Sequence, residues 1–141
     1  GVSTHSRNGR ANSANGSMVD PYTQENRSYP NQKPEVSAPG VLLFSTTSTQ
    51  IEPPYAYSTG TSDSTVLVTG ALALILELYG TALAGDDGVI DAEEMEMVKR
   101  SLASSCDKSG TDGSPHDVRG GYGFLDAVQW ASDIAFELNL A

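Results

Sequence analysis

The sequence is poor in cysteine and in positive charge, and each shortage limits what the chain can do. Cys106 is the single cysteine among 141 residues, so no disulfide can form within the chain. Eight Lys and Arg residues stand against 18 Asp and Glu residues, which gives a formal net charge of −10 at pH 7. Because phosphate groups and anionic lipids both bind basic surfaces, we expect neither nucleic acid nor a membrane as a partner.

Long apolar runs are also lacking. The longest, Val66 to Leu76, is interrupted by Thr69 and Gly70, whereas a helix that spans a bilayer needs about 20 mainly apolar residues. The sequence therefore predicts no transmembrane segment.

The acidic composition has two interpretations. Proteins of salt-loving organisms are typically acidic and poor in lysine, since salt screens the repulsion between their carboxylates. Ordinary acidic proteins share these numbers, so composition leaves a halophilic and an ordinary source both open.

The first predicted elements indicate an α/β protein. Residues 1–35 are mostly polar and predict loops and short extended pieces. The apolar run 41–44 lies between turn-forming residues and predicts a strand covered on both faces, as in a parallel sheet. A polar loop is expected over 46–60. The almost wholly apolar stretch 64–79 then predicts a buried helix that ends at Gly80.

Two amphipathic helices are predicted in the second half of the chain. Asp91 and Glu94 have the spacing of a capping box at the start of a helix over 92–105. A further helix over 124–138 follows a glycine-rich turn. A strand, a buried helix and two covering helices fit the α/β class.

Chemistry is indicated in residues 58–65, Ser-Thr-Gly-Thr-Ser-Asp-Ser-Thr. Ser62 lies between a glycine-containing turn and the apolar helix, where backbone N–H groups are unpaired and the helix carries partial positive charge. An oxyanion that forms next to Ser62 would be stabilised there. Serine also caps helices routinely, which is the commoner reason for such a residue when it is taken alone.

Three segments, in order, resemble the subtilisin family of serine proteases. Residues 33–40, Lys-Pro-Glu-Val-Ser-Ala-Pro-Gly, resemble the stretch that precedes the family's nucleophile. Residues 60–76, which begin Gly-Thr-Ser-Asp-Ser, resemble the nucleophile motif and the helix behind it. Residues 121–127, Gly-Tyr-Gly-Phe-Leu-Asp-Ala, resemble an element near the end of that domain. The resemblance is loose over 1–32 and slight over 80–118.

The resemblance implies that residues 1–141 are the C-terminal portion of a subtilisin-like peptidase domain. It implies an α/β fold with a mainly parallel sheet and helices on both faces. The function implied is hydrolysis of peptide bonds through an acyl-enzyme on Ser62, with a peptide or protein as substrate and an extracellular or secreted location. The alternative is a catalytically inactive structural or interaction module.

The resemblance also assigns residues around the nucleophile. Ser58, Thr59, Gly60 and Thr61 are the implied substrate-binding residues. In the family the triad aspartate, the triad histidine and the oxyanion asparagine precede the serine, so they are expected upstream of residue 1. The expected partner is therefore the missing N-terminal part of the same domain or a second chain.

Two histidines and one substitution depart from the family pattern. His5 lacks the sequence context of a triad histidine, and His116 follows the serine, which is the wrong order. Asp63 stands where the family commonly has Met. We expect its carboxylate to oppose an oxyanion at Ser62.

No cofactor is expected for the chemistry, and no metal ligands are assigned, although structural calcium is allowed. Residues 87–94 resemble the back half of a calcium-binding EF-hand loop. The first and third ligand positions would fall on Leu83 and Gly85, which offer no side-chain oxygen. We therefore favour an acidic turn followed by a helix N-cap over a calcium-binding module.

Overall fold

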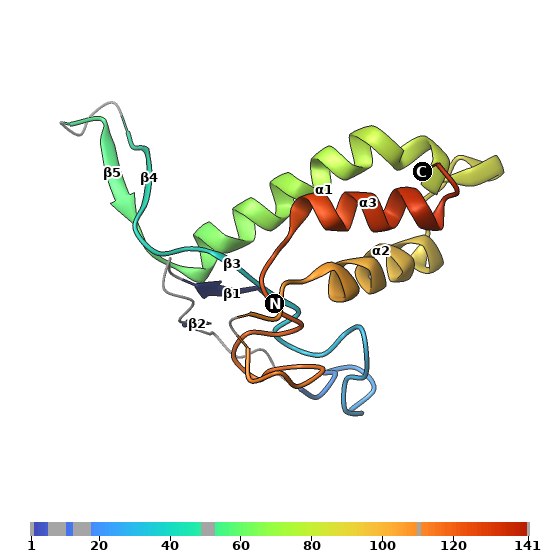
Figure 1. Cartoon of the computed structure of the whole chain (residues 1–141), viewed down its shortest axis with the longest axis horizontal. Helices are drawn as coiled ribbons and strands as arrows, with labels where there is room; N and C mark the ends of the chain where they lie inside the picture. The colour runs from blue at the N-terminus through green and yellow to red at the C-terminus, as the bar shows by residue number, and fades with distance from the viewer. Residues whose placement is uncertain (1, 6–10, 13–17, 49–52, 110, 141) are drawn as a thin grey trace.

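The computed structural model describes residues 2–5, 11–12, 18–48, 53–109 and 111–140. Three helices lie side by side above a small sheet, and a β-hairpin extends away from them (Figure 1). The helices are α1 (Thr61–Leu83), α2 (Ala92–Ser105) and α3 (Ala127–Glu137), with a short 3-10 turn, η1 (Gly85–Asp87), between the first two. Helix α3 contacts both α1 and α2.

The small sheet has the order β2-β1-β3, with β1 at Val2–His5, β2 at Ala11–Asn12 and β3 at Val36–Pro39. Strand β1 runs parallel to β3 and antiparallel to β2. A separate antiparallel pair joins β4 (Leu43–Thr46) to β5 (Tyr55–Ser58). Helix α1 packs on β1 and β3, which places the sheet at the first turns of the helix.

The architecture is mixed α/β, but the mainly parallel sheet with helices on both faces is not found in the described residues. Only β1 and β3 are parallel there, over a register of four residues. The strand expected at 41–44 is found at Leu43–Thr46, but its predicted start and its coverage on both faces are wrong. Leu42 has a φ of 54°, which breaks extended structure and separates β3 from β4. Leu42 and Phe44 are exposed rather than covered on both faces.

Helix α1 is longer and more exposed than the sequence predicts. It begins at Thr61 and continues through Gly80 to Leu83, because one glycine costs a long helix only about 1 kcal/mol. Only Ser64, Ile75 and Leu83 are buried along it. The prediction of a buried helix is therefore wrong for this chain, which leaves several large apolar side chains of α1 in solvent: Val66, Leu67, Leu74 and Leu78.

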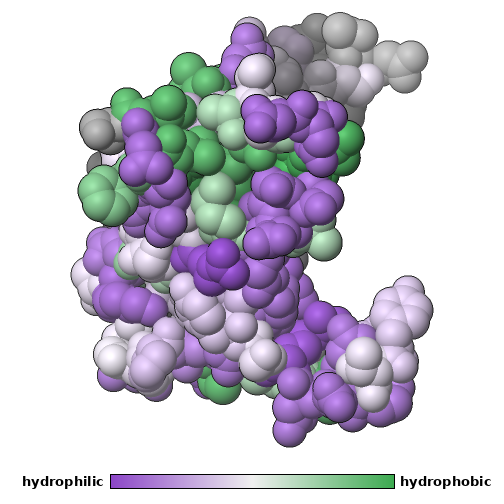
Figure 2. Space-filling view, turned by 90° about the vertical axis from the view of Figure 1, so that its right-hand side faces the viewer, coloured by the Kyte–Doolittle hydropathy of each residue, from purple (hydrophilic) through white to green (hydrophobic). Residues whose placement is uncertain are grey.

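By length and composition alone, α1 is apolar enough to cross a bilayer, a property that it shares with core helices of soluble proteins. The sequence predicted no transmembrane segment because its uninterrupted apolar run is short. The structure has a helix of 23 residues there. On the face shown in Figure 2, hydrophobic side chains gather in the upper part of the view, at the height of the helices, and hydrophilic ones in the lower part, at the height of the loops.

The core lies between the helices and β3. Its buried apolar side chains include Val36, Ile75, Leu83, Val98, Leu102, Tyr122, Trp130 and Ile134. The indole N–H of Trp130 donates to the carbonyl of Val98 at 3.1 Å, which joins α3 to α2. The boundaries of α2 are those predicted from the sequence, and the Asp91–Glu94 capping box is present. Helix α3 is shorter than predicted because Asp126 caps it and accepts from the N–H of Gln129.

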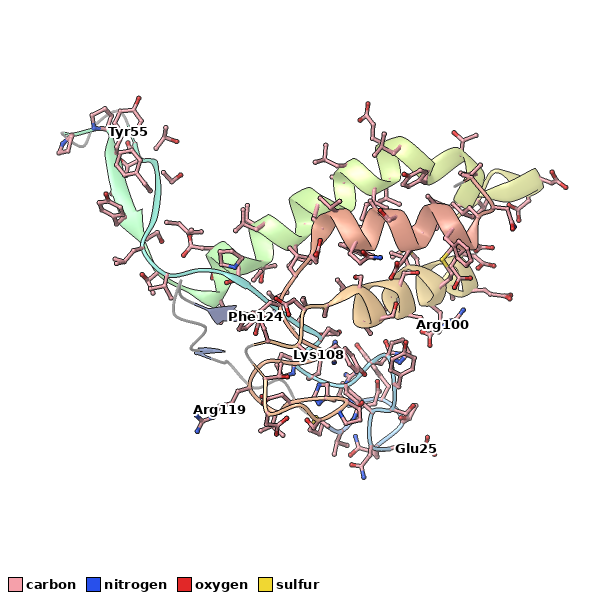
Figure 3. The ribbon with its side chains drawn as sticks, in the orientation of Figure 1. Glu25, Tyr55, Arg100, Lys108, Arg119 and Phe124 are labelled. Atoms are coloured by element: carbon pink, nitrogen blue, oxygen red, sulfur yellow. The ribbon has the colours of Figure 1, made fainter. Side chains whose placement is uncertain are left out.

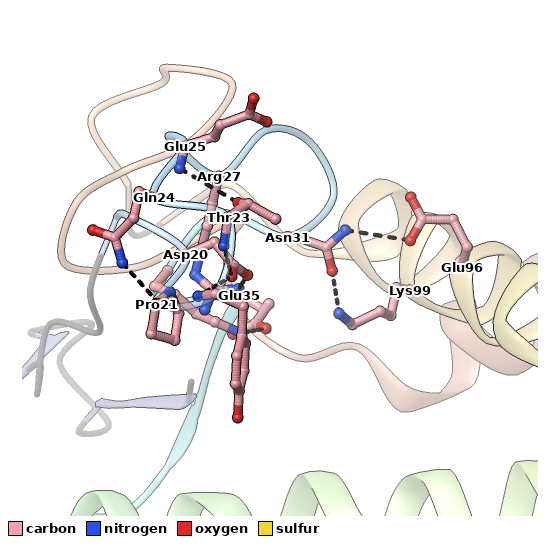
Figure 4. A network of polar contacts seen from close by, with 12 residues as sticks. Asp20, Pro21, Thr23, Gln24, Glu25, Arg27, Asn31, Glu35, Glu96 and Lys99 are labelled. Atoms are coloured by element: carbon pink, nitrogen blue, oxygen red, sulfur yellow. Dashed lines mark hydrogen bonds and ion pairs between the residues drawn. The ribbon is translucent and has the colours of Figure 1, made fainter.

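The segment 18–35 packs on α2 of its own chain through polar contacts (Figure 4). Asn31 lies between two side chains of α2: its amide donates to Glu96 at 3.3 Å, and its carbonyl oxygen accepts from Lys99. The hydroxyl of Tyr29 donates to the backbone carbonyl of Arg100 at 3.3 Å. This polar segment is thus placed both by hydrogen bonds and by two buried prolines, Pro30 and Pro34.

A second segment distant in sequence, 121–125, runs along β3. The N–H of Tyr122 donates to the carbonyl of Glu35, and Ser37 exchanges backbone hydrogen bonds with Gly123 and Leu125, all at 2.8–2.9 Å. Figure 3 shows Phe124 beside this strand. The approach is close: a Cβ on Gly121 would lie 2.5 Å from the carbonyl oxygen of Glu35.

We expect Gly121→Ala to destabilise the protein strongly. Its φ of 68° and its contact with the backbone of Glu35 both oppose a side chain, so the loss is expected to be roughly 3 kcal/mol or more. The matched control is Gly113→Ala, which has a φ of 82° but open space around its Cβ and should lose only about 1 kcal/mol. Urea unfolding monitored by circular dichroism measures both losses. Equal losses would show that the contact with β3 is unimportant.

Candidate functional site

The candidate site is the turn between β5 and α1. Strand β5 ends at Ser58, Gly60 is the N-cap of α1, and Ser62 is the second residue of the helix. The side chain of Ser62 is exposed, and its backbone N–H is one of the first helical donors, which have no partner within the helix. The expected position of Ser62 at the start of the apolar helix is therefore confirmed.

Backbone and side-chain hydrogen bonds hold this turn against the end of β3. The hydroxyl of Ser64 is fully buried and lies 2.9 Å from the carbonyl oxygen of Ala38 and 3.1 Å from that of Pro39. The N–H of Gly60 donates to the carbonyl of Gly40 at 2.8 Å. The first turn of α1 is thus tied to β3 from inside the protein, while Ser62 faces outward.

Two of the four expected substrate-binding residues, Ser58 and Thr59, make side-chain hydrogen bonds that hold the turn. The hydroxyl of Ser58 donates to Asp63 at 2.9 Å. The hydroxyl of Thr59 accepts from the N–H of Leu42 at 2.9 Å and so links the turn to the residue before β4. Gly60 and Thr61 form the N-cap and first residue of the helix. A substrate-binding role for these four residues stays a prediction.

Asp63 was expected to favour the helix start and to oppose negative charge at Ser62, and the structure adds a contact with Ser58 that the sequence did not indicate. Its carboxylate accepts from Ser58 and so bridges the end of β5 to the first turn of α1. A carboxylate in the first turn also interacts favourably with the positive end of the helix. Asp63 therefore helps to hold the shape of the turn.

Of the two histidines, His116 lies away from this turn, whereas the backbone of His5 lies opposite Pro39, at the end of β3 that the turn contacts. The ring nitrogen Nε2 of His116 lies 2.9 Å from the carbonyl oxygen of Pro34, and the ring packs edge-on against Tyr122. Pro34 precedes β3, whereas Ser64 contacts its end, and five extended residues between them span about 16 Å. The side chain of His5 lies outside the described residues.

In residues 87–94, the carboxylates of Asp87 and Asp91 accept hydrogen bonds from backbone N–H groups. Asp87 accepts from the N–H of Val89, and Asp91 from that of Glu93. Hydrogen bonds with Glu94 and from the Glu93 N–H hold the pKa of Asp91 below its usual value. Within the described part of the chain, no three His, Cys, Asp or Glu side chains are grouped to hold a metal ion. Structural calcium stays a prediction.

Cys106 is buried, and its thiol lies 3.0 Å from the carbonyl oxygen of Leu102. Burial raises the pKa of the thiol to about 12, so it is uncharged at neutral pH and has no thiolate for nucleophilic chemistry. The residue is part of the apolar core.

Comparisons with known proteins agree with this fold. The chain belongs to the subtilase family, Peptidase S8, whose family model matches residues 6–124. No curated protein sequence matches the chain. No observation supports a halophilic source.

Two solved structures are similar to this one. The CspB protease of Clostridium perfringens has a TM-score of 0.62 at 20% identity, over 93% of this chain and 25% of that one. The prenylagaramide maturation protease PagA has a TM-score of 0.56 at 23% identity, over 94% of this chain and 41% of that one. At these identities the likeness concerns the fold, and the chain spans less than half the length of either protease.

We expect Ser64→Ala to loosen the turn that carries Ser62. The substitution leaves the buried carbonyl of Ala38 and the part-buried carbonyl of Pro39 without the Ser64 hydroxyl, which should cost about 1–3 kcal/mol of unfolding free energy. The control is Thr65→Ala, since the exposed Thr65 hydroxyl bonds only to Thr61 within the same helix. Its effect should stay within about 0.5 kcal/mol. Chemical denaturation tests both, and equal stability of the two variants would contradict the role given to Ser64.

Proposed function

We propose that this chain is the C-terminal portion of a subtilisin-like serine endopeptidase and that Ser62 is its nucleophile. The observation that carries the proposal is the placement of Ser62: an exposed hydroxyl at the first turn of a long apolar helix, on a turn tied to β3. Membership of the subtilase family supports a serine peptidase kind of reaction.

The proposed reaction begins with attack of the Ser62 hydroxyl on the carbonyl carbon of the cleaved peptide bond. The proton of Ser62 passes to a histidine that an aspartate orients, and both of these groups come from outside this chain. The N–H of Ser62 and the positive end of α1 stabilise the negative charge that develops on the carbonyl oxygen. This chain therefore supplies the nucleophile and part of the oxyanion site.

The remaining part of the domain is proposed to supply the aspartate, the histidine and the oxyanion asparagine, and also to cover α1. The exposed apolar residues of α1 support this, because a soluble protein rarely leaves a large contiguous apolar surface uncovered. The same surface continues onto α3, where the exposed Val128 lines a hollow together with Leu74 and Leu78 of α1. The secreted location remains part of the proposal and rests on the family resemblance alone.

In the complete protein, Ser62→Ala should lower kcat/KM for peptide hydrolysis by about 10⁴-fold or more, because the acyl-enzyme can no longer form. The thermal unfolding temperature should not change, since Ser62 is exposed. Labelling with a fluorophosphonate probe should occur in the wild type and not in the variant. Thr65→Ala is the matched control and should be labelled normally. A wild-type protein that neither hydrolyses peptides nor reacts with the probe would favour the inactive structural module.

The 141-residue chain alone should not hydrolyse peptides, because the base that accepts the proton of Ser62 is proposed to lie on another part of the domain. Added upstream polypeptide, expressed separately, should restore hydrolysis and slow amide hydrogen exchange in α1. Hydrogen exchange followed by mass spectrometry checks the second effect. Activity of the isolated chain that Ser62→Ala removes would contradict the proposal that the base lies elsewhere.

A further inference from the structure

The carboxylate of Asp63 is held close to the place where the oxyanion is proposed to form. Its oxygen Oδ2 accepts from the hydroxyl of Ser58 at 2.9 Å, which directs the carboxylate toward the end of β5. A Cβ built on Gly60 would lie 3.4 Å from this oxygen and 3.7 Å from the backbone nitrogen of Ser62. The carboxylate and the proposed oxyanion donor therefore lie on either side of one small space beside Gly60.

No positive charge in the neighbouring sequence offsets this carboxylate. Residues 34–98, which include β3, the hairpin and α1, contain no Lys or Arg. Figure 3 places Arg100 on α2 and places Lys108 and Arg119 in the loops below the helices. The ion pairs among the described residues join other side chains. Within the described part of the chain, Asp63 is thus a negative charge without a cationic partner.

This charge lies within reach of a bound peptide. In the proposed reaction, the carbonyl oxygen of the cleaved bond lies at the N–H of Ser62. Successive Cα atoms of a peptide are about 3.8 Å apart, so side chains at the bond and next to it come close to Asp63. A carboxylate at this distance opposes a developing oxyanion, and a cation on the peptide offsets that opposition.

We infer that Asp63 selects substrates that carry Lys or Arg at the cleaved bond or one residue from it. This inference rests on the proposed function and adds a charge preference to it. A basic side chain on the substrate has two effects. It forms an ion pair with Asp63 in the bound state, and it offsets the negative field of Asp63 as the oxyanion forms. With an uncharged substrate, only the opposing effect of Asp63 remains.

The two effects predict that one substitution acts in opposite directions on two substrates. Asp63→Asn removes the charge but keeps a side-chain oxygen that can accept from Ser58. It should lower kcat/KM for the basic substrate about fivefold, which is the upper range for a partly exposed ion pair. It should raise kcat/KM for the uncharged substrate about twofold to threefold, mainly through kcat. A role in turn shape alone would change both substrates in the same direction.

The test uses the complete protein and internally quenched peptides that differ at one position. That position is varied from two residues before the cleaved bond to two residues after it, and it carries Lys or norleucine. Norleucine has a side chain of similar length without the charge. The wild type should prefer Lys about fivefold, at a position next to the bond. The preference should shrink between 0.05 M and 0.5 M salt, because salt screens partly exposed charges.

The matched control is Glu77→Gln, which makes the same charge change on the exposed surface of α1. Glu77 lies 14 residues beyond Asp63, or about 21 Å along the helix. That is more than two Debye lengths at 0.1 M salt, so this variant should keep the preference of the wild type. An equal loss of preference in Glu77→Gln would assign the effect to the overall charge of the chain and would overturn the inference.

Two further outcomes would overturn it. One is an unchanged preference for Lys in Asp63→Asn. The other is an equal fall of kcat/KM with both peptides, together with a lower unfolding temperature, which would mean that Asp63 only holds the turn.

A binding measurement separates this inference from the proposed function. In a Ser62→Ala background, Asp63→Asn should weaken binding of a fluorescent Lys peptide about fivefold and leave the norleucine peptide unaffected. Binding of this kind by a protein that hydrolyses nothing would refute the peptidase and retain Asp63 as a site for basic side chains. Hydrolysis without any preference that depends on Asp63 would do the reverse.

Discussion

The position of the candidate nucleophile depends on one buried hydroxyl. Ser64 reaches from the first turn of α1 to two successive carbonyls of β3, where no water competes for the hydrogen bonds. Strand β3 is held in turn by β1 on one side and by residues 121–125 on the other. The turn that carries Ser62 is therefore anchored to the best-supported strand of the chain, and Ser62 itself needs no buried contact.

The turn combines this internal anchor with outer links to the hairpin. Ser58 bonds to Asp63, and Thr59 bonds to Leu42, so both ends of the hairpin are joined to the start of α1. Asp63 consequently has two opposing effects on the proposed chemistry. Its carboxylate holds the turn in shape, and its negative charge lies close to where an oxyanion would form.

The sequence predicted the parts of this structure whose signals are local. Asp91 and Glu94 marked the start of α2, and the Gly-Thr-Ser turn before an apolar stretch placed Ser62 at the start of α1. Hairpin β4–β5 was missed because Pro53 and Pro54 suggested a loop, although Tyr55 and Tyr57 alternate as strand residues do. The exposure of α1 could not be predicted from the sequence, because an apolar helix does not reveal which part of the polypeptide covers it.

The pairing of β3 with residues 121–125 joins parts of the chain that are far apart in sequence, with α1 and α2 between them. Loop-closure entropy makes such distant pairings late events in folding. Helices α1 and α2 depend on local hydrogen bonds and form earlier, while β3 gains its second neighbour only when the C-terminal third has been synthesised. The strand that anchors Ser64 is thus completed last. In a peptidase, this order would keep the nucleophile from being fixed in place until residues 121–125 have been synthesised.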